Sequence, residues 1–213
     1  MGNISQPTIN RLCAIYQILI EVENAGVLTI SSSELGEKAG IGSHNVRKDI
    51  SSMGGVGSGG AGYEVTKLKD AIALKFGFTD QKLTCIVGLG RIGTALLQHA
   101  QNAQGEFRII AGFDSNINKL ETIKTTINVF PAYQIPEMIR KMGIELGILS
   151  VPEAAAQEAA GRMIEGGIRG IINFTAAHII VPSKGVFVKN IDITGELRIL
   201  TALIKIDPYS NDN

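Results

Sequence analysis

The chain has 213 residues, of which 45% are hydrophobic and 19% charged, and its 20 basic and 20 acidic side chains cancel. This composition is typical of globular proteins and excludes disordered and collagen-like chains, while the length fits one large domain or two small ones. Cys13 and Cys85 form no Cys-x-x-Cys motif, so the sequence predicts neither a disulfide framework nor a zinc site. The N-terminus is polar and no apolar run is long enough to cross a membrane, so we expect a cytoplasmic protein.

Residues 1–80 show the pattern of a small helical domain. Apolar residues recur at helical spacing over residues 7–23, and the Ser31…Glu34 pair forms a capping box that starts a second helix ending near Ala39. The turn at residues 40–42 contains two glycines, and Ser43 is expected to cap a third helix that ends near Met53. Two short helices joined by a tight glycine turn predict a helix-turn-helix. A fourth helix is expected over residues 65–76.

A glycine-rich stretch follows the helix-turn-helix. Residues 54–62 contain six glycines, a density that is incompatible with a helix and too permissive for a packed strand. We therefore expect a hairpin or loop at the position of the wing in a winged-helix domain. Residues 79–82 are expected to join this domain to the rest of the chain.

From residue 83 onward, short apolar runs alternate with helical stretches. Strands are predicted at residues 83–87, 108–113, 147–151, 170–174 and 186–188. Helices are predicted at residues 94–104, 136–142 and 152–165. This alternation indicates a parallel sheet with crossover helices. A last helix, over residues 194–206, carries an apolar stripe that needs a partner, formed by Leu197, Leu200, Leu203 and Ile204.

The first apolar run of this second part is followed by a dinucleotide-binding motif. Residues 88–93 fit G-x-G-x-x-G between a predicted strand and a predicted helix, and Asp114 ends the next strand. Glycines allow a pyrophosphate to approach the backbone, the helix N-terminus supplies amides, and the carboxylate accepts from ribose hydroxyls. A free Asp114 carboxylate would repel a 2′-phosphate, so the sequence favours NADH and NAD+ over NADP(H). The candidate cofactor-binding residues are Gly88, Leu89, Gly90, Arg91, Ile92, Gly93 and Asp114, with Val151, Pro152, Asn173 and Phe174 at later strand ends.

The third helix is the candidate DNA-reading element. At about 100° per residue, Val46, Ile50 and Met53 would point inward, leaving a polar outer face. The candidate DNA-binding residues are Ser43, His44, Asn45, Arg47, Lys48, Ser51 and, in the glycine-rich stretch, Ser58. An exposed Arg-Lys-Asp run is also typical of an ordinary solvated helix face. Moreover, residues 1–80 carry 7 basic and 8 acidic side chains, which gives DNA binding no support from net charge.

Metal binding is not indicated by the sequence. His44, His99 and His178 are scattered and lack the spacing of metal ligands.

Taken together, the order of these motifs resembles the Rex family of redox-sensing transcriptional repressors over nearly the whole chain. The matching segments are residues 46–51, 60–63, 88–93, 113–114, 147–152 and 190–192. The resemblance implies a homodimer that binds double-stranded operator DNA when NADH is scarce and releases it when NADH binds, without catalysing a reaction. It also implies a division into a winged-helix domain (1–80), a Rossmann domain (81–192) and a C-terminal helix and tail (193–213) exchanged between subunits.

The resemblance further implies a network that links the nucleotide state to the DNA-binding domains. Its members would fall on Arg11, His99 and Asp192, with His99 in place of the family's tyrosine. The chain also departs from the family at Ser58-Gly59-Gly60, where relatives carry basic residues, and at Thr175-Ala176, where they have Ala-Pro. Two alternatives therefore stay open: a Rex-like paralogue that binds NAD(H) but binds DNA weakly or not at all, and an NAD-dependent dehydrogenase.

Overall fold

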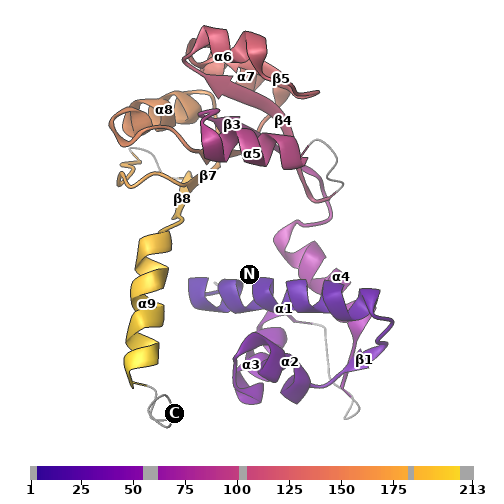
Figure 1. The fold of residues 1–213 in the computed structure, drawn as a ribbon. Coiled ribbons are helices and arrows are strands. Elements are labelled where there is room, and N and C mark those ends of the chain that lie inside the picture. The colour runs from indigo at the N-terminus through magenta and orange to yellow at the C-terminus, as the bar shows by residue number, and fades with distance from the viewer. Residues whose placement is uncertain (1–3, 55–61, 101–104, 182–184, 207–213) are drawn as a thin grey trace. The chain divides into compact units, whose positions relative to one another are not determined.

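The computed structural model describes residues 4–54, 62–100, 105–181 and 185–206. The chain divides into two compact units, Met1–Asp80 and Gln81–Asn213 (Figure 1). Within the described residues, no helix is long and apolar enough to cross a membrane.

The first unit is helical and contains one short pair of strands. Its elements are α1 (Gln6–Asn24), β1 (Thr29–Ile30), α2 (Ser32–Ala39), α3 (Ser43–Met53), β2 (Tyr63–Glu64) and α4 (Val65–Phe76). The strands β1 and β2 pair antiparallel, with Ile30 opposite Tyr63. One core holds the unit together, and its fully buried members include Leu12, Ile15, Leu19, Leu35, Ile50, Leu68 and Ile72. The helices agree with those predicted. The strand β2 follows the glycine-rich segment predicted as a wing, of which residues 55–61 lie outside the described residues.

The helix starts in this unit test two capping predictions. The capping box of α2 is confirmed, because Ser31 Oγ accepts from the Glu34 amide at 3.1 Å and Glu34 Oε2 accepts from the Ser31 amide at 2.7 Å. The predicted cap by Ser43 is wrong. Gly42 occupies the cap position with an extended backbone, and its carbonyl accepts from the Asn45 and Val46 amides, so Ser43 is already helical.

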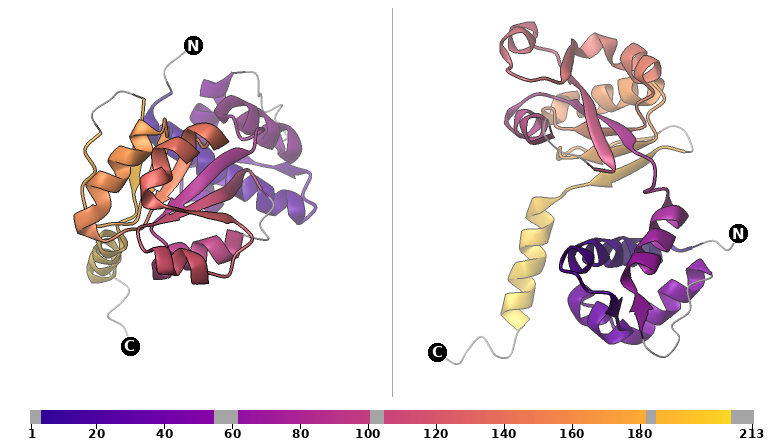
Figure 2. Two further views of the ribbon diagram at one scale, coloured as in Figure 1. Left: turned by 90° about the horizontal axis from the view of Figure 1, so that it is seen from above. Right: turned by 90° about the vertical axis from the view of Figure 1, so that its right-hand side faces the viewer.

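The second unit is a six-stranded parallel sheet with helices on both faces (Figure 2). Its strands are β3 (Lys82–Val87), β4 (Phe107–Asp114), β5 (Asn128–Pro131), β6 (Leu146–Leu149), β7 (Gly170–Asn173) and β8 (Phe187–Asn190). Its helices are α5 (Arg91–Ala100), α6 (Ile117–Thr122), η1 (Ala132–Gln134), α7 (Ile135–Met142), α8 (Glu153–Glu165) and α9 (Ile193–Ile206). The spatial order β5-β4-β3-β6-β7-β8 is that of a Rossmann fold.

Two apolar clusters hold the helices to this sheet. One joins Phe113 and Leu149 of the sheet to Ile139 of α7 and Met163 of α8. The other joins Ile86 of the sheet to Leu97 of α5, with apolar residues of the α6 region packed against it. The chain reverses direction across the sheet between β3 and β6, which is where a fold of this kind opens a ligand crevice.

The sequence-based boundaries shift at several points in this unit. Two of the predicted strands end too late, because β6 stops at Leu149 and β7 at Asn173, which leaves Val151 and Phe174 in loops. The strands predicted at residues 108–113 and 186–188 end too early, since β4 extends to Asp114 and β8 to Asn190. The helix expected from residue 94 begins at Arg91, and residues 101–104 of that prediction lie outside the described residues. The short elements α6 and β5 were not predicted.

Candidate functional site

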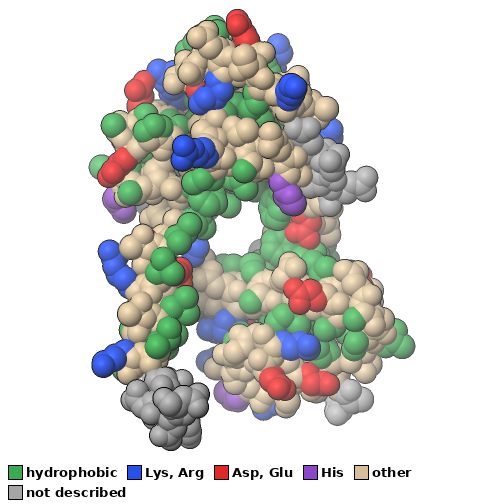
Figure 3. All heavy atoms as spheres, in the orientation of Figure 1, with side chains coloured by type: hydrophobic (Ala, Val, Ile, Leu, Met, Phe, Trp, Pro, Cys, Tyr) green, Lys and Arg blue, Asp and Glu red, His purple; other side chains and the backbone are tan. Residues whose placement is uncertain are grey.

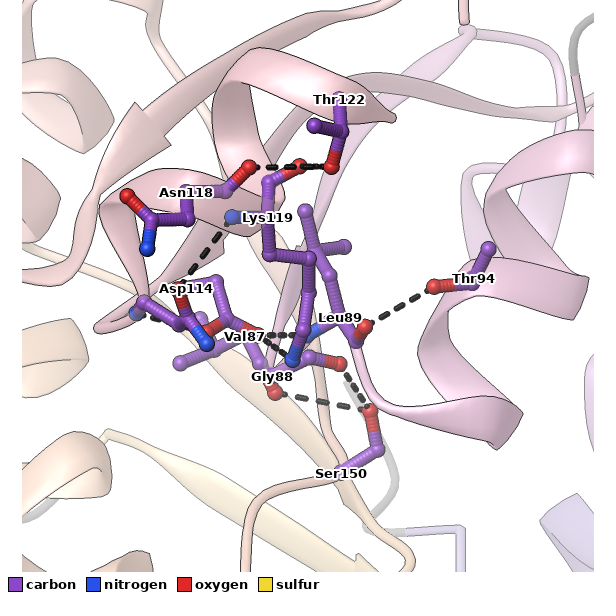
Figure 4. Close-up of polar contacts among 10 residues, drawn as sticks. Val87, Gly88, Leu89, Thr94, Asp114, Asn118, Lys119, Thr122 and Ser150 are labelled. Atoms are coloured by element: carbon purple, nitrogen blue, oxygen red, sulfur yellow. Dashed lines mark hydrogen bonds and ion pairs between the residues drawn. The ribbon is translucent and has the colours of Figure 1, made fainter. Parts of the chain in front are cut away.

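The site begins where β3 and β6 end side by side. The Gly88 amide donates to the Phe113 carbonyl, and the Ser150 amide donates to the Val87 carbonyl, both at 2.8 Å. The Ser150 hydroxyl donates to the Gly88 carbonyl at 2.8 Å (Figure 4). Ser150 therefore ties the glycine loop to the neighbouring strand end. Sequence reasoning did not assign it this role.

The three motif glycines have different physical tasks. Gly88 has φ +96°, and a Cβ there would lie 2.6 Å from the Ser150 carbonyl oxygen. A Cβ on Gly93 would lie 1.9 Å from the Gly88 carbonyl oxygen, so helix α5 can approach the loop only at a glycine. A Cβ on Gly90 would meet nothing within 4 Å. Gly88 and Gly93 are thus required by the fold, whereas Gly90 leaves open space beside the start of α5.

The start of α5 faces this open space. The Gly90 carbonyl accepts from the Thr94 amide at 2.9 Å, and the Thr94 hydroxyl donates to the Leu89 carbonyl at 2.8 Å. The first amides of an α-helix have no partner within the helix and favour an anion. Backbone and helix together therefore fit a pyrophosphate at Gly90.

Asp114, at the end of β4, is the central acid of the site. Its Oδ2 accepts from the Leu89 amide at 2.8 Å and from Lys119 Nζ at 2.9 Å, and its Oδ1 accepts from the Asn116 amide at 2.8 Å. Burial raises the pKa of the Asp114 carboxyl, but the hydrogen bonds from Asn116, Lys119 and Leu89 outweigh this, and the pKa lies below its ordinary value. The carboxylate is therefore charged and oriented, and Oδ1 keeps room for a further donor. The Asp114 carboxylate is paired with Lys119, whereas the sequence suggested a free carboxylate.

A pocket of about 370 Å³ opens beside this acid. Its lining includes Gly88, Gly90, Asp114, Val151 and Pro152, five of the predicted cofactor residues. Residues that sequence reasoning missed complete the wall, namely Lys119 and Asn116 after β4, Ser150 after β6, and Glu158 and Arg162 of α8. A second groove beside it is lined by Leu89, Gly90, Arg91 and Lys119, among others.

The remaining predicted cofactor residues lie elsewhere. Asn173 is fully buried and lines neither opening. Its side-chain amide donates to the Ala177 carbonyl and to Asn190 Oδ1, and its Oδ1 accepts from the amide and hydroxyl of Thr175. Its side chain therefore fixes the loop after β7. Phe174 is half-buried and absent from the lining of both openings, and Ile92 is half-exposed at the start of α5.

Helix α3 presents the predicted polar face. Val46, Ile50 and Met53 are buried, and the predicted DNA-binding side chains of the helix point outward. Those exposed are His44, Asn45, Arg47, Lys48 and Ser51, while Ser43 is half-buried. Arg47 Nη1 also donates to Ser32 Oγ at the start of α2, at 2.9 Å. Ser58 lies outside the described residues.

The residues predicted to form a switch network fall in both units. Arg11, on α1, forms an ion pair with buried Asp49 of α3. In the second unit His99 is exposed on α5, and Asp192 Oδ1 accepts from the Gly195 amide at 2.8 Å, which caps α9. The network itself stays a prediction. The burial of Asp49 was not predicted, because an Arg-Lys-Asp run is typical of a solvated helix face.

Metal binding gains no support from the described residues. Among them, no group of three or more His, Cys, Asp or Glu side chains is placed to hold a metal ion.

The fold and the site define a class of protein in which a helix-turn-helix unit precedes a dinucleotide-binding Rossmann unit. Family models agree with both halves: residues 3–51 match "Putative DNA-binding protein N-terminus" and residues 79–177 match "CoA binding domain". The redox-sensing transcriptional repressor Rex of Carboxydothermus hydrogenoformans is 33% identical over 96% of this chain and 98% of its own. Rex of Streptococcus equi subsp. equi is 38% identical over 93% of each chain.

Solved structures give the same result. The chain is similar to RSP, a Rex-family repressor, with a TM-score of 0.84 and 28% identity over 96% of this chain and 97% of that one. RSP in complex with beta-NAD+ and operator DNA has a TM-score of 0.85 and 29% identity, over 96% of this chain and 94% of that one. RSP in complex with beta-NADH has a TM-score of 0.83 and 26% identity, over 96% of each. The chain belongs to the Rex family of redox-sensing transcriptional repressors.

Proposed function

We propose that this chain is a redox-sensing transcriptional repressor, not an enzyme, that binds operator DNA and releases it when NADH occupies the Rossmann unit. The observation that carries the proposal is that one chain combines a helix α3 with an exposed polar face and a pocket lined by Gly88, Gly90 and Asp114. Relatives at 33–38% identity are redox-sensing repressors, and a similar Rex-family repressor has been solved with NADH and with NAD+ and operator DNA.

The proposed dinucleotide site uses the geometry around Gly90 and Asp114. The backbone at Gly88–Gly93 and the start of α5 would hold the pyrophosphate, and Asp114 would accept from a ribose hydroxyl. Val151 and Pro152 would pack against the bound molecule from the β6 side. Lys119 would keep Asp114 charged and oriented, since it donates to Oδ2.

NADH and NAD+ differ by the positive charge of the oxidised nicotinamide, which is costly to place in a closed apolar pocket. Thermodynamic linkage between nucleotide binding and DNA binding then converts this difference into a change in DNA affinity. Shifting a two-state equilibrium from 1:99 to 99:1 requires about 10⁴-fold tighter binding to the favoured state. We infer that NADH binds more tightly to a geometry of the dimer in which the two α3 helices do not fit the operator.

DNA binding is assigned to the exposed face of α3. Arg47 and Lys48 would contact guanine edges or phosphates, with His44, Asn45 and Ser51 beside them. Ser43 and Ser58 belong to the proposed interface from the sequence alone. A repressor of chromosomal genes acts in the cytoplasm of a bacterium, so we propose that location.

A homodimer is proposed from helix α9. The apolar stripe of α9 is visible along the helix in Figure 3. Its members Leu197, Leu200, Leu203 and Ile204 are each more than half exposed in the single chain. A second copy that exchanges this helix would cover them. Residues 193–213 would then form the dimerisation segment beyond the winged-helix (1–80) and Rossmann (81–192) domains, with Arg11, His99 and Asp192 as the coupling network.

A paralogue that binds NAD(H) but no DNA is the second candidate. It is favoured by the balanced charge of residues 1–80 and by the uncharged stretch 54–62. The similarity to repressors over 96% of the chain favours the repressor over both this candidate and a dehydrogenase.

The test is a fluorescence-anisotropy titration of a palindromic duplex that the protein itself selects from a randomised library. The duplex is titrated without nucleotide, with NAD+ and with NADH. Specific binding that NADH alone abolishes supports the repressor. Tight NADH binding by calorimetry without DNA binding in any state supports the paralogue, and steady oxidation of NADH with a carbonyl substrate would indicate a dehydrogenase.

A further inference from the structure

The reading helix α3 is tied to α1 by a buried carboxylate. Arg11 approaches Asp49 with two nitrogens, Nε at 2.5 Å from Oδ2 and Nη2 at 2.8 Å from Oδ1. The Asp49 side chain is only 3% exposed, against 33% for Arg11. Thr8 completes the group, since its hydroxyl donates to Asp49 Oδ1 and accepts from Arg11 Nη2, both at 3.2 Å. Both oxygens of the buried acid are therefore engaged by side chains of α1.

This contact differs in kind from the apolar packing around it. Val46, Ile50 and Met53 pack α3 into the core, but apolar contacts have no preferred direction. A planar guanidinium that binds both oxygens of a carboxylate fixes orientation as well as distance. Because the side chains of a helix are attached to one rigid backbone, a small rotation of α3 about its axis would move every side chain of its outer face. The ion pair thus restrains the rotation of α3.

Asp49 also follows directly after the two cations of the outer face. Arg47 and Lys48 are exposed, whereas Asp49 points inward. Within one helical turn, two side chains are thus available to contact DNA, and the third binds α3 to Arg11 of α1. We propose that Asp49 is a positioning residue for DNA reading, which holds Arg47 and Lys48 in register with the groove through its ion pair with Arg11. This inference rests on the proposed function, and it gives Arg11 a direct effect on the reading helix within its own unit.

A second ion pair in the same unit offers a matched control. Lys69 Nζ of α4 lies 2.5 Å from Glu23 Oε2 of α1, and the Thr66 hydroxyl donates to Glu23 Oε1 at 2.9 Å. This pair also joins a cation to a carboxylate of α1, but through the single nitrogen of a lysine, and it joins α1 to α4 instead of α3. Its loss weakens the unit without releasing the reading helix.

The experiment compares Asp49→Asn with Glu23→Gln in the full chain without nucleotide. The duplex selected by the wild-type protein and a shuffled duplex are titrated, and stoichiometric titration gives the active fraction. We expect Asp49→Asn to lower the ratio of specific to non-specific affinity by about tenfold, the effect of one disrupted base-pair contact. Glu23→Gln should leave this ratio unchanged. A purely structural role would reduce the active fraction and leave the ratio intact.

Two further variants guard against a chain that fails to fold. Arg11→Lys keeps the charge but loses the two-nitrogen geometry, and Thr8→Val removes one hydrogen bond from Asp49 at nearly constant shape. The ratio should fall for Arg11→Lys and less for Thr8→Val. If the wild-type protein binds its duplex specifically and these variants match it, the positioning role is wrong while the repressor stands. If the wild-type protein selects no duplex, both proposals fall.

Discussion

Alanine at two glycines of the dinucleotide loop should separate ligand binding from folding. In Gly90→Ala the new methyl group meets nothing within 4 Å, so the fold can accept it. In Gly93→Ala the Cβ would lie 1.9 Å from the Gly88 carbonyl oxygen, a distance that no folded chain sustains. The first variant is thus expected to fold normally and lose NADH, and the second to lose stability.

The magnitudes follow from these distances. The backbone around Gly93 must move by about 1 Å or more, and overpacking of this kind costs about 1–3 kcal/mol. At roughly 4 °C per kcal/mol, this lowers the Tm by about 4–12 °C. Gly90→Ala should change the unfolding free energy by less than about 0.5 kcal/mol. Its methyl group occupies the space where a pyrophosphate would approach, so NADH affinity should fall at least about tenfold, or 1.4 kcal/mol.

Differential scanning calorimetry without and with NADH, and isothermal titration calorimetry with NADH, measure the two effects separately. Gly90→Ala should keep the wild-type Tm without ligand and show a smaller NADH-induced rise in Tm than the wild type. If it binds NADH as tightly as the wild type does, no pyrophosphate lies against Gly90 and the assignment of the loop is wrong. A normal Tm for Gly93→Ala would refute the packing argument.

The remaining predictions concern the site acid, the last helix and a core thiol. Because the folded-state pKa of Asp114 lies below its ordinary value of 3.8, its contribution to stability should be complete above about pH 5 and lost as the pH falls through the lowered pKa; acid unfolding of Asp114→Asn should lack this component. Leu197→Asp with Leu200→Asp should convert a dimer to a monomer in sedimentation velocity, whereas Arg198→Asp, also on α9, should not. Burial raises the pKa of Cys85 to about 12, so a thiol reagent at pH 8 should label this residue only after unfolding; rapid labelling of the native protein would contradict its burial.

Local signals in the sequence predicted the elements that the structure shows most clearly. The capping box of Ser31 and Glu34 is encoded within four residues, and the motif at residues 88–93 is encoded within six. Asp114 could be placed because a strand end and a fixed distance from the glycines both point to it. Each of these features depends on neighbours in the chain, and the folded structure keeps them.

The features that were missed depend on distant residues. Ser150 matters because β6 lies beside β3, a pairing that brings together residues 62 positions apart. Asp49 is buried because Arg11, 38 positions away, neutralises it, and helical periodicity alone gives no sign of that partner. Asn173 was expected in the ligand pocket, but its amide is consumed by Ala177 and Asn190. Lys119 could have been noticed, since it lies only five residues after Asp114 in the sequence.

The burial of Asp49 changes what the charge of residues 1–80 means for an approaching polyanion. The 7 basic and 8 acidic side chains sum to −1. One of those acids, Asp49, is buried, and its charge is neutralised by Arg11. DNA would meet Arg47 and Lys48 without their sequence neighbour, and at physiological salt a field is screened beyond about 8 Å. The potential near α3 is therefore set by which charges face outward there and not by the total. A domain with no net positive charge can still present a cationic surface to DNA.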